Sequence, residues 1–278
     1  MRARSKIKGC YSMLAKCANK FLIINFSFLI FSLSARAQDS VLRVKVTDDV
    51  WVEMVRVEGG TFTMGSNATP KGVRLTYALA GPEHRVTVDG YWIGRYEVTQ
   101  DLWEAVMGSN PSKFKGEGMP VECVSWEDAQ RFCMMLSQLT GKHFRLPTEA
   151  EWEFAARGRT RTTAFPGCER GELGEFCWYC VNGEGHTHAV GQLKPNVLGL
   201  YDMGGNVAEW CQDWVEEYSK EAQTNPRGPK TGENRVLRGG HYGSTSAACT
   251  VYDRGWYLPT GRYEFYGLRL VMEESNED

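Results

Sequence analysis

Three side chains that could do chemistry stand in one loop near the C-terminus. His241, Ser244 and Cys249 follow an apolar run at 236–237 and a pair of glycines at 239–240. Imidazole, hydroxyl and thiol groups serve metal binding and covalent catalysis. Paired glycines allow positive φ and a close backbone approach, so we expect a strand that delivers this loop to a site. His241 and Cys249 are too few to specify a metal, and a structural role is the alternative.

Two other groups resemble parts of metal sites. His186 and His188 place two imidazoles on one face of a predicted strand, without a third ligand. Cys177 and Cys180, together with Cys168, suggest zinc or a disulfide. No second pair at zinc-ribbon spacing follows, so the pattern favours a local Cys177–Cys180 disulfide in an exposed loop.

The cysteine count constrains the pairing but does not define it. Seven cysteines follow residue 37, and an odd number leaves at least one thiol free or paired between chains. One hypothesis links Cys249 to Cys211, because both flank the predicted site. The seven residues are Cys123, Cys133, Cys168, Cys177, Cys180, Cys211 and Cys249.

The N-terminus has the features of a secretory signal peptide. Residues 1–20 carry basic side chains and no acid, residues 21–33 are almost continuously apolar, and Ala35-Arg36-Ala37 forms an A-x-A signal. We expect cleavage between Ala37 and Gln38 and export to the periplasm or the extracellular space. A signal anchor is the alternative.

Charge and hydropathy limit the classes of partner that the chain is expected to bind. The first 37 residues hold seven of the 32 Lys and Arg and none of the 34 Asp and Glu, so the remainder has a formal charge near −9. An acidic surface disfavours nucleic acid and anionic membranes and is compatible with cations. After the N-terminal run, no segment reaches the ~18 apolar residues of a membrane span.

Capping residues predict three helices, and alternation predicts strands. Val50–Met64 is expected to form a β-hairpin around Gly59-Gly60, and Arg85–Ile93 two strands around a turn. The first expected helix covers 100–107, between the cap Thr99 and Gly108. The second begins at Ser125, with Asp128 in a capping-box-like position, and ends at Gly141. The third begins with the Thr148–Glu151 capping box and ends at Gly158.

From Arg159 onward regular patterns disappear for more than a hundred residues. Large aromatic side chains spread through this stretch can bury enough area to order it. We therefore expect one domain over residues 51–272, after the signal peptide (1–37) and a short lead (38–50), with a tail at 273–278.

Several motifs in order resemble the formylglycine-generating enzyme family, also called the sulfatase-modifying-factor family. They span about residues 55–271. The segments that carry the resemblance are Gly59–Ser66, Glu97–Gln100, Pro120–Trp126, Arg145–Gly158, Asn196–Trp210, the loop with His241, Ser244 and Cys249, and Tyr266–Val271. The resemblance implies an α+β, variant C-type-lectin fold with little regular structure in a single domain.

The resemblance also implies an active site from which this chain departs. The founding enzyme oxidises a sulfatase cysteine to formylglycine with oxygen, using two cysteines that hold copper(I). The second corresponds to Cys249, but the first is Ser244. His241 stands where the family usually has a serine after the glycine pair, and Ala208 stands where the family has a tryptophan near the site. Copper(I) prefers thiolates over a neutral hydroxyl, so copper binding and its reaction are not expected here.

A calcium site of the family corresponds to Asp202, Gly205, Val207 and Glu209, as two carboxylate side chains and two backbone carbonyls. Calcium takes oxygen ligands that irregular loops can supply. Asp202 replaces the enzyme's asparagine, which adds negative charge. The alternative is that Asp202 and Glu209 cap turns without a metal. The ligands of a second family site, near Trp178–Gly185, are not assigned.

Two function hypotheses follow from these residues. The first is an exported, calcium-stabilised module that binds a peptide, protein or glycan, or serves as a scaffold, and does not make formylglycine with copper. The second is an oxidoreductase or other enzyme of the family, with altered chemistry at His241, Ser244 and Cys249.

Overall fold

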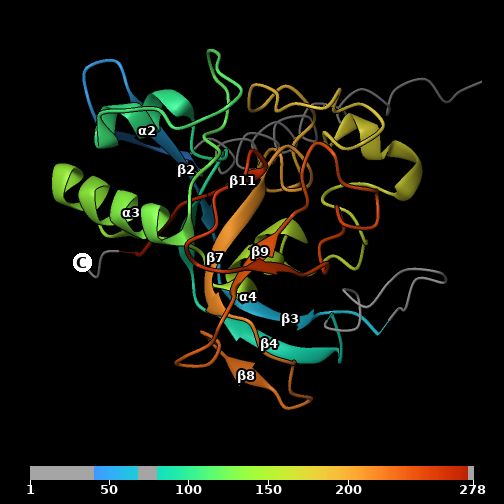
Figure 1. The fold of residues 1–278 in the computed structure, drawn as a ribbon. Coiled ribbons are helices and arrows are strands. Elements are labelled where there is room, and N and C mark those ends of the chain that lie inside the picture. The colour runs from blue at the N-terminus through green and yellow to red at the C-terminus, as the bar shows by residue number, and fades with distance from the viewer. Residues whose placement is uncertain (1–40, 68–79, 275–278) are drawn as a thin grey trace, which may run out of the picture. The chain divides into compact units, whose positions relative to one another are not determined.

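The computed structural model describes residues 41–67 and 80–274 (Figure 1). The predicted signal peptide and its cleavage site therefore lie outside the described residues. In the described part, no helix is long and apolar enough to cross a membrane.

The three predicted helices are confirmed with their caps. Thr99 accepts the backbone N–H of Leu102 at the start of α2, and both α3 and α4 begin with a complete capping box. Each cap satisfies backbone donors that the first helical turn leaves unpaired. The helices are α2 (Gln100–Met107), α3 (Trp126–Thr140), α4 (Glu149–Ala156) and the 3₁₀ helix η2 (Arg170–Glu175).

The described strands form three small sheets. Their orders are β1-β2-β5-β12-β6, β10-β9-β7-β11 and β3-β4-β8. Figure 1 shows β7 passing through the middle of the fold, with the β3-β4-β8 sheet at one end. The strands are β1 (Val41–Lys45), β2 (Trp51–Val57), β3 (Gly60–Met64), β4 (His84–Val88), β5 (Tyr91–Gly94), β6 (Phe144–Arg145), β7 (Ala208–Trp214), β8 (Gln223–Thr224), β9 (Arg235–Arg238), β10 (Gly255–Tyr257), β11 (Tyr266–Gly267) and β12 (Val271–Met272).

The predicted hairpin over Val50–Met64 is wrong in its pairing, although both strands exist. β2 pairs with β1 and β5, whereas β3 pairs with β4 in a different sheet. The chain changes sheets at Gly59, where an added Cβ would lie 2.8 Å from the Val88 carbonyl oxygen. The N-terminal lead also contributes structure, because β1 pairs with β2 along its whole length.

Two large apolar clusters and one small cluster make up the core. The first surrounds Trp103, Phe132 and Trp210, and the second surrounds Trp152 and Phe154. The third contains cysteines and lies in the irregular region. Large buried rings thus order the long stretch after residue 159, which contains β7, a seven-residue strand that the sequence did not indicate.

Candidate functional site

β9 delivers the predicted loop, and the glycine pair has the expected geometry. Gly239 and Gly240 have φ values of 91° and 70°. A Cβ on Gly240 would lie 2.8 Å from the carbonyl oxygen of Ala248, closer than real Cβ contacts come. Glycine at 240 therefore lets the chain turn back on itself immediately after the strand.

His241 and Ser244 are joined through the backbone. The His241 N–H donates to Ser244 Oγ at 3.0 Å, and the Ser244 N–H donates to the His241 carbonyl at 2.8 Å. The imidazole stacks on Phe265 with ring centroids 4.5 Å apart, and its Nδ1 accepts the Gly243 N–H at 3.2 Å. Burial lowers the pKa of His241 to about 4, so the ring is neutral at pH 7.

Cys249 lies buried, with no exposed surface. Burial raises the pKa of its thiol to about 12, which keeps it protonated at neutral pH. A protonated thiol is a poor nucleophile and a poor metal ligand. In the described part of the chain no hydrogen bond joins the side chains of His241, Ser244 and Cys249. They share a loop without forming a nucleophile–base arrangement.

Neither predicted disulfide is formed. All seven cysteines of the described chain are free thiols. Cys211 lies in the second core cluster and Cys249 in the third, while Cys177 is buried and Cys180 is exposed. In each of the two predicted pairs, Cys211–Cys249 and Cys177–Cys180, the two cysteines therefore lie in different environments.

Asp202 is buried, and one of its two carboxylate oxygens has no partner. Its backbone has a φ of 55°, its Oδ2 accepts the Gly191 N–H at 2.8 Å, and its buried Oδ1 has no partner. Burial raises the pKa of Asp202 to about 6. A buried carboxylate oxygen without a donor is costly, and a bound cation would relieve that cost.

Glu209 is already engaged by protein donors. Its carboxylate accepts Arg269 Nη2 at 2.7 Å, Arg269 Nε at 3.0 Å and Trp152 Nε1 at 2.7 Å. Arg269 is fully buried and also donates to the carbonyls of Gly94 and Tyr201. In this geometry Glu209 positions Arg269 and presents no free oxygen to a metal.

Glu97 belongs to the same buried network, and the sequence did not identify it. Asn206 Nδ2 donates to Glu97 Oε2 at 2.6 Å, and the Val207 N–H donates to Oε1 at 3.1 Å. Burial, and then the neighbouring Asp202 and Glu209, raise the pKa of Glu97 well above its ordinary value. Three buried carboxyl groups thus surround a single arginine, Arg269. This excess of negative charge is compensated by protonation or by a cation.

The predicted calcium ligands therefore fit a cation only in part. Asp202 supplies one free side-chain oxygen, whereas Glu209 is occupied by Arg269. In residues 41–67 and 80–274, no three His, Cys, Asp or Glu side chains lie close enough to hold one ion together. Backbone carbonyls, including those predicted at Gly205 and Val207, would have to complete the coordination.

Gly205 shows how tightly the backbone is packed here. It pairs with Trp178 in an isolated bridge, and the Asn206 N–H donates to the Trp178 carbonyl at 2.8 Å. A Cβ on Gly205, whose φ is 78°, would lie 1.9 Å from that carbonyl oxygen. Only glycine fits this position.

A row of aromatic rings runs beside the loop, and we call it the aromatic row. Neighbouring rings have centroids between 3.9 and 6.1 Å apart. Tyr242 is buried, Tyr263 is 36% exposed, and the other members are partly exposed. Its members are Trp178, His188, His186, Phe114, Tyr242, His241, Phe265, Tyr263, Tyr257 and Tyr266.

His186 and His188 lie in this row and not on a strand, so that prediction is wrong. Their rings lie 4.6 Å apart, and His188 stacks on Trp178 at 3.9 Å. His186 Nδ1 lies 2.7 Å from the Thr187 carbonyl, and His188 Nε2 lies 3.2 Å from the Gly183 carbonyl. Backbone contacts and stacking thus account for both rings without a metal.

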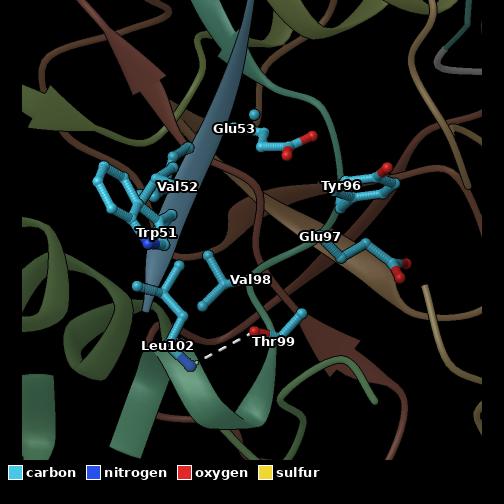
Figure 2. Close-up of a pocket in the computed structure, with 10 residues that line it drawn as sticks. Trp51, Val52, Glu53, Tyr96, Glu97, Val98, Thr99 and Leu102 are labelled. Atoms are coloured by element: carbon cyan, nitrogen blue, oxygen red, sulfur yellow. Dashed lines mark hydrogen bonds between the residues drawn. The ribbon is translucent and has the colours of Figure 1, made fainter. Parts of the chain in front are cut away.

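A small cavity lies away from the loop, between β2 and the start of α2 (Figure 2). Figure 2 shows Tyr96 and Glu97 on one side and Trp51 and Val52 on the other. His241, Ser244 and Cys249 do not line it. The cavity therefore contains none of the three loop residues, but it shares Glu97 with the buried carboxyl network around Arg269.

Comparison with known proteins adds a family and its relatives. Residues 44–274 match the protein family described as "Sulfatase-modifying factor enzyme 1-like domain". The chain is 32% identical to "Chaperone protein LppX" of Paenibacillus barcinonensis, over 92% of this chain and 99% of that protein. It is 29% identical to a formylglycine-generating enzyme of Mus musculus, over 72% of this chain and 68% of the enzyme.

One solved structure has a similar fold. "Treponema denticola variable protein 1" superposes with a TM-score of 0.77 at 32% identity. The superposition covers 84% of this chain and 99% of that chain. The arrangement of helices and small sheets is thus shared across the described domain.

Proposed function

Because the chain belongs to the sulfatase-modifying factor enzyme 1-like family and has its variant C-type-lectin fold, we propose that it is an exported binding module. In this proposal the aromatic row holds a peptide segment of a partner, and calcium stabilises the domain. The loop that holds the copper site in the family's oxidases here supports a binding surface.

The aromatic row is the observation that carries the proposal. Tyr263, Phe265 and His241 form consecutive stacks at 5.4 and 4.5 Å, and Tyr263 exposes about a third of its surface. Rings fixed by stacking lose little conformational entropy when a ligand binds, and tyrosine combines apolar area with a polar tip. Such side chains contribute strongly to peptide and protein interfaces.

The chemistry of the loop supports binding over copper-dependent oxidation. Ser244 stands where the first thiolate ligand is expected, and its hydroxyl accepts a backbone N–H. Cys249 is fully buried, with a raised pKa. Soft copper(I) prefers thiolate ligands, and Ser244 offers a neutral hydroxyl in place of one of them.

A peptide is favoured over a glycan because of a relative. The Paenibacillus protein matched over nearly its whole length is named a chaperone. Chaperones bind polypeptide segments, and partly exposed aromatic side chains suit apolar peptide side chains. A glycan ligand is the competing outcome of the experiment below.

The calcium part of the proposal is supported by Asp202. Its unpartnered buried oxygen and the surplus of carboxyl groups beside Arg269 favour a cation. The carbonyls of Gly205 and Val207 would complete the ligands. Export is proposed from the N-terminal sequence, and a mature N-terminus other than Gln38 would contradict the cleavage site.

An array of unrelated peptides and glycans, probed with the purified mature protein, tests the binding function. We expect peptide binding that Tyr263→Ala weakens at least tenfold. Trp51→Ala is the matched control, because Trp51 is 40% exposed but lies outside the aromatic row. Binding of glycans alone, or an equal loss in both variants, would contradict the peptide proposal. Oxidation of a Cys-x-Pro-x-Arg peptide that Cys249→Ala abolishes would overturn the non-catalytic reading.

A further inference from the structure

Three of the five buried residues in the smallest core cluster are cysteines. Cys168, Cys177 and Cys249 pack together with Phe165 and Leu173. None exposes more than 4% of its surface. The cluster joins two segments that are distant in the sequence, the stretch around η2 and the end of the loop after β9. The family resemblance makes Cys249 the counterpart of a copper ligand, but neither it nor the proposed binding function assigns a role to Cys168 or Cys177.

Cys177 and Cys249 approach the same glycine from the two segments. A Cβ on Gly204 would lie 2.8 Å from Cys177 Sγ and 3.2 Å from the Cys249 carbonyl oxygen. A Cβ on Gly240 would lie 3.3 Å from Cys249 Sγ. Gly204 therefore leaves both cysteines room beside the same turn, and any larger residue there would collide with the Cys177 sulfur.

Other contacts hold the two segments against each other. The Cys180 N–H donates to the Ser244 carbonyl at 3.0 Å. A Cβ on Gly183 would lie 2.3 Å from the Tyr242 carbonyl oxygen. The stretch that follows Cys177 is thus in direct contact with the loop that precedes Cys249.

We propose that Cys177 and Cys249 are a disulfide-forming pair that cross-links the η2 segment to the loop after β9. The structure shows the reduced form, in which both thiols are free. Burial raises the pKa of the Cys177 thiol, and the neighbouring Cys249 and Cys168 add to this shift. Burial also raises the pKa of the Cys249 thiol to about 12, and Asp253 and Cys180 add to that shift.

The oxidation balances with a small-molecule disulfide as the oxidant. A thiolate of the pair attacks the oxidant and forms a mixed disulfide, which releases one thiol. The second protein thiolate then displaces the other half of the oxidant. The two protein thiols lose two protons and two electrons, and the oxidant becomes two thiols. Because both sulfurs are buried, we expect the reaction to proceed through local opening of the loop and to be slow.

The cross-link would fix the surface that carries the aromatic row. Trp178 and His188 lie on the segment after Cys177, whereas His241 and Tyr242 lie on the loop before Cys249. A bond between the segments would restrict their relative motion. This consequence extends the proposed function, but the cross-link itself can be tested without any ligand.

The test is oxidation of the full chain with oxidised glutathione, followed by non-reducing peptide mapping. We expect one peptide pair joined through Cys177 and Cys249, a loss of two hydrogens, and a thermal midpoint that rises relative to the reduced protein. Cys180→Ser is the matched control, because Cys180 is exposed and its loss should leave the cross-link intact.

Several results would overturn the proposal. A Cys180–Cys249 link, a Cys168–Cys177 link, a Cys177–Cys180 link, or free Cys177 and Cys249 after prolonged oxidation would each contradict it. Mapping of the wild-type protein gives this answer even if the Cys177→Ser or Cys249→Ser variant fails to fold.

Discussion

Replacing Asp202 by asparagine should test whether Asp202 is a calcium ligand. Asparagine keeps the shape and tolerates the positive φ, but it removes the charge. Burial raises the pKa of Asp202 from 3.8 to about 6, and each pKa unit corresponds to about 1.4 kcal/mol. Without calcium, the ionised side chain therefore costs the folded state about 3 kcal/mol.

The sign of the pH dependence follows from the direction of this shift. The folded protein binds the proton of Asp202 more tightly than the unfolded chain does. The stabilisation of the folded state by proton binding at Asp202 is complete below about pH 4 and is lost as the pH rises to about 6. In a chelator, Asp202→Asn should therefore be up to about 3 kcal/mol more stable than the wild type at pH 7.5 and nearly equal to it at pH 3.5.

Calcium in high excess should reverse the order of the two proteins. A ligand at a thousand times its dissociation constant stabilises the folded state by about 4.1 kcal/mol, which exceeds the cost of about 3 kcal/mol for the ionised Asp202. Urea unfolding at pH 7.5, with and without calcium, measures both effects. Asp213→Asn is the control, because burial raises the pKa of Asp213 to about 8 but its Oδ2 accepts the Glu149 N–H elsewhere in the fold. A wild type that gains no stability from calcium, or an equal gain in Asp202→Asn, would refute the reasoning.

Two further substitutions test the packing that supports the site. Gly205→Ala should destabilise the domain by more than about 3 kcal/mol, because its Cβ would overlap the Trp178 carbonyl. Gly171→Ala, where nothing lies within 4 Å of an added Cβ, should change the free energy of unfolding by less than about 1 kcal/mol; equal losses would contradict the steric argument. Ser125→Ala removes the N-cap of α3 and should cost about 1 kcal/mol in chemical denaturation, and an unchanged midpoint would show that the cap is dispensable.

The helices could be predicted because their signals are local. Ser125 and Thr148 each stand three residues before an acidic side chain that accepts the backbone N–H of the capping residue. Gly108 and Gly141 end their helices in the left-handed conformation. The sheets could not be predicted in this way. β2 and β3 are neighbours in sequence, yet they pair in different sheets. Strand pairing depends on tertiary contacts that alternation does not encode.

The contacts of the candidate site could not be predicted from the sequence. The family resemblance predicts Asp202 and Glu209 as ligands, but the sequence cannot show that Arg269, sixty residues after Glu209, occupies that carboxylate. Glu97 was visible only as part of a motif. Its role depends on Asn206, which lies more than a hundred residues away along the chain.

The path of the loop after β9 depends on the backbone more than on its side chains. Two positive φ values at Gly239 and Gly240, and the reciprocal bonds between residues 241 and 244, define its turn. The Ser244–His241 backbone bond would form with any residue at 244, and a cysteine there would leave it intact. The resemblance places a thiol at this position in the family's oxidases, and either residue allows this backbone bond; Ser244 Oγ additionally accepts the His241 N–H. In the same loop, His241 gains a stack on Phe265 that extends the aromatic row. His241, which the resemblance places where the family has a serine, thus adds a ring to the surface on which the proposed ligand would bind.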